Sequence, residues 1–254
     1  MNLSKLTLEL AEMAQGTETV LVTDSDIPGK RITVNSFSGI TGEYTNGSLW
    51  FINDGSEYDM RSITHAVGNT ITLNDSIPDT VKQAYICAGT PFTFQHFISA
   101  VNFVLASYPI TATDNSLQTE PEKSEYILPS EINDVRRVKI GDSVSHYWVI
   151  IGDRLFLYGE KSSEIKPLSI TYVKYHDRLI KPSDCADRAV RMDYVKYMSY
   201  LYLFRNQVER RHGDNPISDD LMQEAKAYEQ LCTQQRIPGR DLMIKDLCYP
   251  YVPS

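Results

Sequence analysis

Short runs of β-branched and aromatic residues, separated by Gly-Asp pairs, occupy residues 126–175 and restrict the fold more than any other stretch. Glycine and aspartate tolerate a positive φ, so a Gly-Asp pair between two such runs is typical of a β-hairpin turn. Two pairs stand in this position, Gly141-Asp142 and Gly152-Asp153. The pattern therefore predicts a compact antiparallel sheet, with strands over residues 135–140, 147–151, 155–158 and 170–175.

Residues 19–91 carry a second set of short strand patterns. Runs of four or five β-forming residues alternate with turn residues, and Asn46-Gly47 is the strongest hairpin-turn signal among them. Short strands at this spacing are typical of a small barrel or sandwich. We therefore expect residues 19–91 to form a β module inserted into the rest of the chain.

Helical periodicity precedes and follows this module. Asn2 or Ser4 is the expected N-cap of a helix over residues 4–15. Apolar residues recur every three or four positions over residues 93–107, which predicts a second helix with a broad buried face. Residues 110–125 are polar and irregular, and we expect them to form a surface loop.

Two more helices are expected near the C-terminus. Ser183 or Asp184 caps the longest of them, which ends near Gly213, and the other ends near residue 236. These patterns predict an α+β fold: a helical bundle (N-terminal helix, middle helix, C-terminal helix pair) with a small central antiparallel sheet and an inserted β-barrel or sandwich module. The helical core is expected to consist of residues 1–18, 92–109 and 176–236.

Charge and cysteine content exclude some classes of protein. The formal net charge is −8, whereas a general nucleic-acid binder needs clustered Lys and Arg. The four cysteines lack the spacing of a zinc site, which favours free thiols in a reducing cytosol. Lys5, Glu9 and Glu12 interrupt the apolar core that a signal peptide would need, and no run reaches the length of a membrane span.

No residue pattern predicts catalysis, a cofactor or a metal ion. The five histidines lie far apart in the sequence, and the chain has no phosphate-binding loop, dinucleotide-binding motif or nucleophile elbow. Asp24 and Asp26 give a weak metal signal, for which a surface turn is the favoured interpretation. A triad assembled from distant residues stays open, but the sequence favours a protein that is not an enzyme.

Tyrosine is unusually frequent, with sixteen copies, and many lie in the last third of the chain. Tyrosine buries a large area and keeps a polar tip, so it is enriched at protein interfaces. We expect core packing to use some of these residues and a subunit interface to use the rest. The expected interface residues are Tyr194, Tyr197, Arg205, Arg210 and Arg211, although the arginines equally fit a solvated helix end.

The last eighteen residues, 237–254, combine three prolines with many apolar side chains. A tail of this composition is expected to dock on a protein surface and to become ordered only there. The side chains that we expect to dock, on another protein or on a neighbouring subunit, are Leu242, Met243, Ile244, Leu247, Tyr249 and Tyr251.

The order of these patterns resembles the head-to-tail adaptor proteins of tailed bacteriophages, also called connector, head-completion or neck proteins. The resemblance covers residues 3–231. It is one of pattern, because the family has no diagnostic short motif. It rests on G-S-L-W-F-I-N-D-G, M-R-S-I-T and T-I-T-L-N in the β module, on Y-W-V-I, L-F-L-Y and I-T-Y-V-K-Y in the central sheet, and on the Tyr-rich closing helices.

The resemblance implies a structural protein of the virion neck, made in the host cytoplasm, without enzymatic activity or cofactor. Copies would form a homo-oligomeric ring, expected to be a dodecamer, with portal protein above and a tail or neck protein below. The ring would surround passing double-stranded DNA without specific binding, which the acidic net charge suits, and would contact no membrane.

Two other functions stay open. One is another tail or baseplate component, in which residues 19–91 recognise a partner. The other is an enzyme that acts on carbohydrate or peptide, with Asp and Glu residues as acid and base. The second alternative requires two carboxylates that face each other across a cleft.

Overall fold

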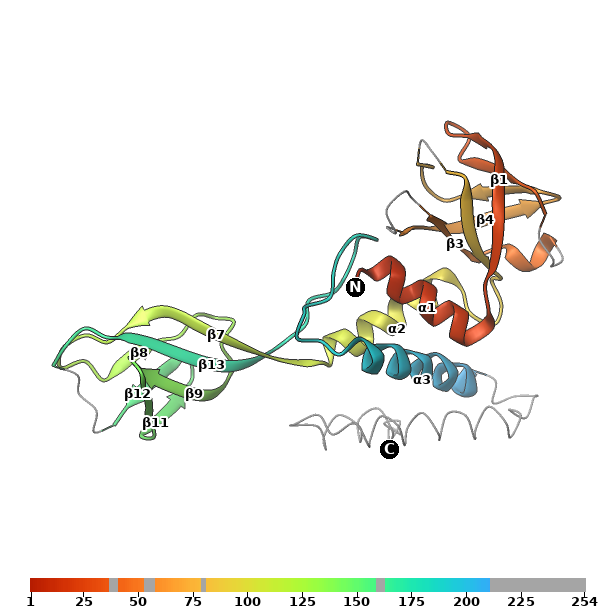
Figure 1. The fold of residues 1–254 in the computed structure, drawn as a ribbon. Helices are drawn as coiled ribbons and strands as arrows, with labels where there is room; N and C mark the ends of the chain where they lie inside the picture. Colours follow the sequence, from red (N-terminus) through yellow and green to blue (C-terminus); the bar gives the residue numbers. More distant parts are fainter. Residues whose placement is uncertain (37–40, 53–57, 79–80, 159–162, 211–254) are drawn as a thin grey trace. The chain divides into compact units, whose positions relative to one another are not determined.

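The computed structural model describes residues 1–36, 41–52, 58–78, 81–158 and 163–210 (Figure 1). The chain divides into two compact units. Unit 1 contains Met1–Ala106 and the described residues from Asp177 onward, and unit 2 contains Ser107–His176.

Unit 1 contains a closed six-stranded antiparallel barrel with the strand order β1-β2-β5-β4-β3-β6. Closure pairs both edges of every strand, so the barrel offers no free edge to another chain. Alternate side chains of the strands fill its interior, among them Val20, Ile32, Ile63 and Ile71. The strands are β1 (Glu18–Asp26), β2 (Arg31–Val34), β3 (Ser48–Ile52), β4 (Tyr58–Val67), β5 (Thr70–Leu73) and β6 (Gln83–Cys87), and a short 3-10 helix η1 (Thr41–Tyr44) precedes β3.

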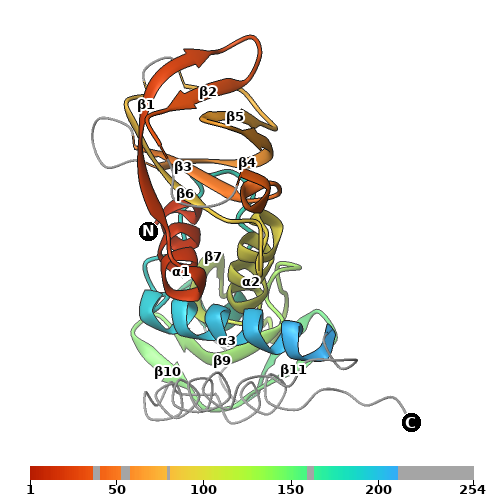
Figure 2. The same ribbon diagram turned by 90° about the vertical axis from the view of Figure 1, so that its right-hand side faces the viewer.

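Three α-helices are described, all in unit 1: α1 (Leu3–Gln15), α2 (Phe94–Ala106) and α3 (Met192–Arg210). The side chain of Asn2 caps α1 by accepting a hydrogen bond from the backbone N–H of Lys5 at 2.9 Å. Gly16, at a φ of +76°, ends α1 and donates its N–H to the carbonyl of Glu12. In Figure 2 the barrel lies at one end of α1 and α2, and α3 crosses both helices at the other end.

Strand β3 is buried on both faces because it lies between the barrel interior and the helices. Leu49 and Phe51 point into the barrel core. Trp50, fully buried, points the other way, and its ring centroid lies 6.4 Å from that of Phe97 in α2. Its indole N–H donates to the hydroxyl of Thr7 in α1 at 3.2 Å. This strand therefore joins the barrel to the helices.

Unit 2 consists of two antiparallel sheets. One is four-stranded, with the order β10-β9-β13-β7, and the other is three-stranded, with the order β11-β12-β8. Tyr126 and Leu155 of the smaller sheet share a buried cluster with Val138, Leu168 and Ile170 of the larger one, so the sheets pack on each other. The strands are β7 (Pro109–Gln118), β8 (Glu125–Ile127), β9 (Asp134–Ile140), β10 (Ser143–Ser145), β11 (Trp148–Ile151), β12 (Arg154–Leu157) and β13 (Pro167–Tyr175).

The expected fold class, a helical bundle with a small central antiparallel sheet, is wrong. The described part of the chain is mostly β, with 42% of its residues in strands against 22% in helices, and a six-stranded closed barrel forms part of it. The sequence pattern overstated the helices because helical caps and apolar spacing are easy to recognise, whereas polar strands are not. The expectation for residues 19–91 left a barrel and a sandwich open, and the structure has the barrel.

The surface loop expected at residues 110–125 is also wrong, because β7 occupies most of it. β7 pairs along its length with β13, from Pro109 opposite Tyr175 to Gln118 opposite Pro167. Its polar side chains face solvent on one side of the sheet, which hides the strand from a search for apolar runs.

The long C-terminal helix begins at Met192 rather than at Ser183 or Asp184. Asp184 turns its carboxylate back to the backbone N–H groups of Ile180 and Lys181, both at 2.8 Å, instead of capping a following helix. Asp residues make such local bonds in competition with helix formation. The expected last helix, residues 218–236, lies outside the described residues.

Candidate interaction surface

The three-stranded sheet of unit 2 exposes an apolar face. In the strand register, Ile151 of β11 lies opposite Arg154 of β12, and Arg154 lies opposite Ile127 of β8. Residues directly opposite each other share a face of the sheet. Ile127 and Ile151 are 62% and 59% exposed, whereas the neighbouring row, to which Leu155 belongs, is turned into the core. The outward face is therefore apolar at both edges.

The next outward row of the same face contains Val149, Phe156 and Glu125. Val149 is exposed and Phe156 half-buried, so the apolar surface continues along the sheet. Arg154 and Glu125 form an ion pair across this face. The hydrogen bond from Arg154 to Glu125 raises the pKa of the guanidinium further above its usual value. The face thus combines branched apolar side chains with one paired cation and anion.

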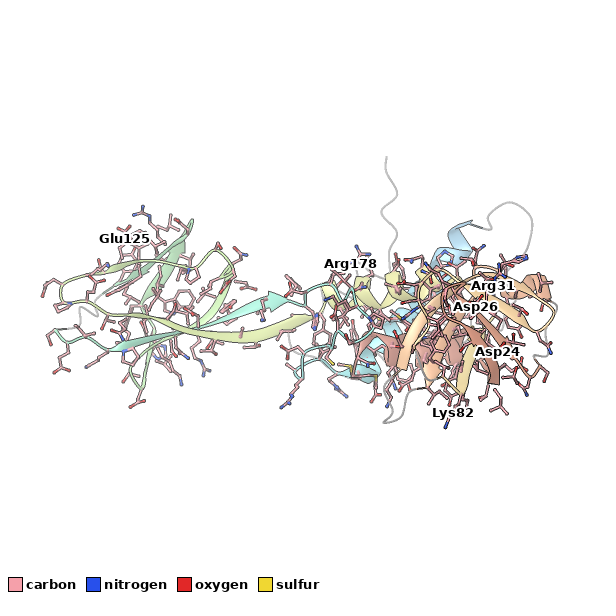
Figure 3. The ribbon with its side chains drawn as sticks, turned by 90° about the horizontal axis from the view of Figure 1, so that it is seen from above. Asp24, Asp26, Arg31, Lys82, Glu125 and Arg178 are labelled. Carbon is pink, nitrogen blue, oxygen red and sulfur yellow. The ribbon has the colours of Figure 1, made fainter. Side chains whose placement is uncertain are left out.

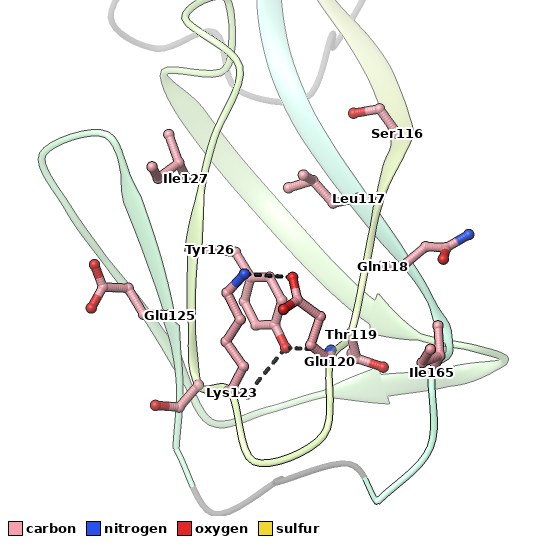
Figure 4. A pocket seen from close by; sticks show the side chains of 11 residues that line it. Ser116, Leu117, Gln118, Thr119, Glu120, Lys123, Glu125, Tyr126, Ile127 and Ile165 are labelled. Carbon is pink, nitrogen blue, oxygen red and sulfur yellow. Dashed lines mark hydrogen bonds and ion pairs between the residues drawn. The ribbon is translucent and has the colours of Figure 1, made fainter.

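A groove of about 710 Å³ opens between the end of β7 and β8 (Figure 4). The two strands are consecutive in the chain and belong to different sheets, and the turn of residues 119–124 joins them. Exposed Ile127 and Ile165 and half-buried Leu117 supply its apolar walls. Its full lining is Ser116, Leu117, Gln118, Thr119, Glu120, Lys123, Ser124, Glu125, Tyr126, Ile127 and Ile165.

Hydrogen bonds hold the turn at the base of the groove. The hydroxyl of buried Tyr126 donates to the carbonyl of Lys123 at 3.0 Å and accepts from the N–H of Glu120 at 3.2 Å. Lys123 pairs with Glu120 at 2.5 Å, and its ammonium lies 5.5 Å from the centroid of the Tyr126 ring. The hydrogen bond with Glu120 raises the pKa of Lys123. Hydrogen bonds therefore fix the base of the groove, and the cation of Lys123 and the carboxylates of Glu120 and Glu125 lie on its lining.

Both sides of the groove are strand edges. Among the described strands, β7 pairs with β13 alone and β8 pairs with β12 alone. The backbones of Ser124 and Leu128 bond to those of Leu157 and Asp153, so in the antiparallel alternation the backbone groups of Glu125 and Ile127 point away from β12. The N–H of Thr119 bonds to Lys166, so by the same alternation the backbone of Gln118 points away from β13.

Of the residues expected at a subunit interface, the structure describes the side chains of Tyr194 and Tyr197. Tyr194 is 2% exposed and is packed inside unit 1, whereas Tyr197 is half-buried. Arg205 and Arg210 lie on α3. Arg211 and the expected docking residues Leu242, Met243, Ile244, Leu247, Tyr249 and Tyr251 lie outside the described residues.

Sequence reasoning missed the groove because it assigned residues 110–125 to a loop. A usable signal was present: Ile110, Ala112 and Asp114 alternate with Thr111 and Thr113, which is a strand pattern with one polar face. The turn of residues 119–124 has a local signal in Pro121, which favours the second position of a turn, and the hydroxyl of Tyr126 adds bonds to Glu120 and Lys123 that no local pattern predicts.

Asp24 and Asp26, which gave a weak metal signal, lie on the β1–β2 hairpin (Figure 3). Their carboxylates accept backbone N–H bonds from Ser25 and Gly29, as in a surface turn. Within the described ranges, no three His, Cys, Asp or Glu side chains lie close enough to hold a metal ion. In the same part of the chain, no helix has the length and apolar character needed to span a membrane.

A second hollow, in unit 1, lies between β4 and the segment around Leu179. It contains Arg61, whose guanidinium bonds to the carboxylate of Asp59 and to the carbonyls of Met60 and Ser76. Groups of unit 1 already occupy the guanidinium of Arg61, so the hollow is a less developed binding surface than the groove of unit 2.

No known family model matches this chain, and no curated protein matches its sequence significantly.

Proposed function

We propose that this chain is a structural protein of the virion neck of a tailed phage, a head-to-tail adaptor. Its copies form a ring that connects the portal to the tail and surrounds the DNA channel. The sequence patterns that resemble adaptor proteins motivate this function, and the character of the unit 2 surface supports it.

The supporting observation is the concentration of exposed apolar side chains on unit 2. Of the fourteen large apolar side chains exposed in the described residues, eight belong to unit 2, the smaller unit. These are Ile127, Val144, Tyr147, Val149, Ile151, Tyr158, Ile165 and Tyr175. Exposed apolar surface with open strand edges is typical of a protein that binds other proteins. A closed ring requires two different, matching surfaces on each subunit. The exposed face of the three-stranded sheet, with Ile127, Val149 and Ile151, would supply one of them.

Imaging with portal protein tests the proposal. We expect negative-stain images of the mixture to show a ring of this chain on one end of the portal. Replacing Val149 and Ile151 by Glu should abolish the ring, because carboxylates would enter the buried contact without partners. Ile180→Glu is the matched control, since Ile180 is 77% exposed and lies in unit 1. Portal particles that stay bare with the unchanged chain would refute the adaptor function.

A further inference from the structure

The groove between β7 and β8 has the properties of a site for an extended peptide. Outward-pointing backbone groups line both of its sides, from Gln118 on one strand and from Glu125 and Ile127 on the other. A strand that enters meets donors and acceptors on both flanks, as in β-strand addition. The parts of the two edges that line the groove are each three residues long, residues 116–118 of β7 and Glu125–Ile127 of β8, so the site fits a short segment.

The residues that line the groove also indicate which side chains a bound peptide should have. Leu117, Ile127 and Ile165 line it, so the side chains directed inward should be branched and apolar. Lys123 and the carboxylate of Glu125 stand on its lining, so charges of both signs at the ends of the apolar run would be complementary.

One segment of this chain has that composition. Leu242, Met243 and Ile244 form a three-residue apolar run, bounded by Asp241 on one side and Lys245 on the other. In an extended conformation Leu242 and Ile244 point to the same side, and Asp241 and Lys245 flank them. From Arg210, where the described chain ends, thirty-two residues lead to Leu242, a length that extended chain can stretch to roughly 100 Å.

We infer that the groove of unit 2 binds residues 241–245 of a second copy of this chain, as an added strand between β7 and β8. Leu242 and Ile244 contact Leu117 and Ile127, and the ends of the run meet Lys123 and Glu125. The choice of a second copy rests on the proposed ring, in which exchanged tails link neighbouring subunits. The groove and its chemistry do not depend on that choice.

A labelled peptide of residues 239–247 measures the interaction directly. The receptor is the full chain with Leu242→Ser and Ile244→Ser, so that its own tail does not compete. We expect saturable binding by fluorescence anisotropy, and no binding of a peptide that carries the same two serines. Ile127→Glu in the receptor should weaken binding by about tenfold or more, because it places a carboxylate against the apolar run.

Val67→Glu is the matched control, since Val67 is 58% exposed, close to the 62% of Ile127, and lies in unit 1, whereas the groove lies in unit 2. It should leave peptide affinity unchanged. Equal effects of the two variants, or no binding at all, would overturn the assignment of the groove.

Sedimentation velocity identifies the source of the bound tail. We expect the unchanged chain to form larger species as its concentration rises and the Leu242→Ser, Ile244→Ser variant to remain a monomer. If the unchanged chain is a monomer at every concentration and the peptide binds only the variant, each tail fills its own groove and the second copy is excluded. Portal binding is measured separately, so a failed adaptor function and a failed groove give different results.

Discussion

Thr7 connects α1 to the barrel through a hydrogen bond with Trp50 of β3. Its hydroxyl accepts from the indole N–H of Trp50 and donates to carbonyl groups in its own helix, those of Leu3 and Ser4. All these groups are buried, so no water replaces a lost bond. A single oxygen therefore satisfies the polar atom of the largest side chain in the barrel wall.

Thr7→Val keeps the shape of the side chain and removes the acceptor for Trp50. We expect it to lower the free energy of unfolding by roughly 1–3 kcal/mol, the penalty of an unsatisfied buried donor. Urea unfolding followed by Trp50 fluorescence, in a Trp148→Phe background, measures it. Thr64→Val is the control, because the Thr64 hydroxyl bonds at an exposed site. A loss no larger than that of the control would contradict the role of Thr7.

Cys87 and Cys185 should differ in reactivity. Burial raises the pKa of the Cys87 thiol to about 11, against the opposing effect of a hydrogen bond from Gln15. The thiolate is the reactive form, so Cys87 should resist iodoacetamide at pH 8.5 in the folded chain, whereas exposed Cys185 should react. Mass spectrometry of the digested protein reads both sites. Equal labelling before denaturation would show that Cys87 is accessible.

At the scale of elements, the segment between β13 and α3 accepts backbone hydrogen bonds from the first residues of α1 and so fixes the start of this helix. The N–H groups of Leu3 and Ser4 donate to the carbonyls of Asp184 and Pro182. The carboxylate of Asp184 in turn holds the backbone of Lys181 and Ile180. The two N–H donors lower the pKa of Asp184 because they stabilise its ionised form, and the N–H of Lys181 has the larger effect.

This lowered pKa predicts a pH dependence. Because the pKa is lower in the folded chain than in the unfolded one, the ionised carboxylate adds stability above the ordinary Asp value of about 3.9, and this is lost as the pH falls through the folded value. The stability difference between wild type and Asp184→Asn should therefore be largest near neutral pH and should shrink in acid. Urea midpoints of unit 1 over a pH series measure it. A difference that is the same at every pH would contradict the role of the carboxylate.

The sequence predicted the elements whose signals are local. Asn2 caps α1 as one of the two expected residues, and Gly141 and Gly152 adopt the positive φ that their hairpin turns require. Apolar periodicity placed α2 within a residue of its observed ends. In each case the decisive interaction lies within a few positions of the chain.

The parts that could not be predicted depend on distant partners. β7 is polar and becomes a strand only because β13 pairs with it, at residues 49 to 66 positions later in the chain. Asp184 is a good cap in sequence, but its carboxylate bonds to residues that precede it. The groove also depends on a distant partner, since it needs the edge of β7, together with a turn to which Tyr126 bonds. No local pattern contains this information.

At the scale of the whole molecule, the division into two units separates two hydrophobic cores. Leu49 belongs to the barrel core of unit 1 and Leu155 to the core between the sheets of unit 2, and both are fully buried. A cavity in one core should therefore leave the other intact.

Leu49→Ala and Leu155→Ala test this independence. Each should destabilise its own unit by roughly 2–5 kcal/mol, through lost burial and a residual cavity. Hydrogen exchange read by mass spectrometry should then rise only in peptides of the altered unit. Faster exchange across both units in either variant would show that they unfold as one.

The assembly itself is tested most directly by the absolute mass of the chain alone and mixed with portal protein, by light scattering after size-exclusion chromatography. A head-to-tail adaptor predicts a complex heavier than the portal by a whole multiple of 28.9 kDa, with twelve as the expected multiple. Two peaks that keep the masses of the separate proteins would contradict the proposed function.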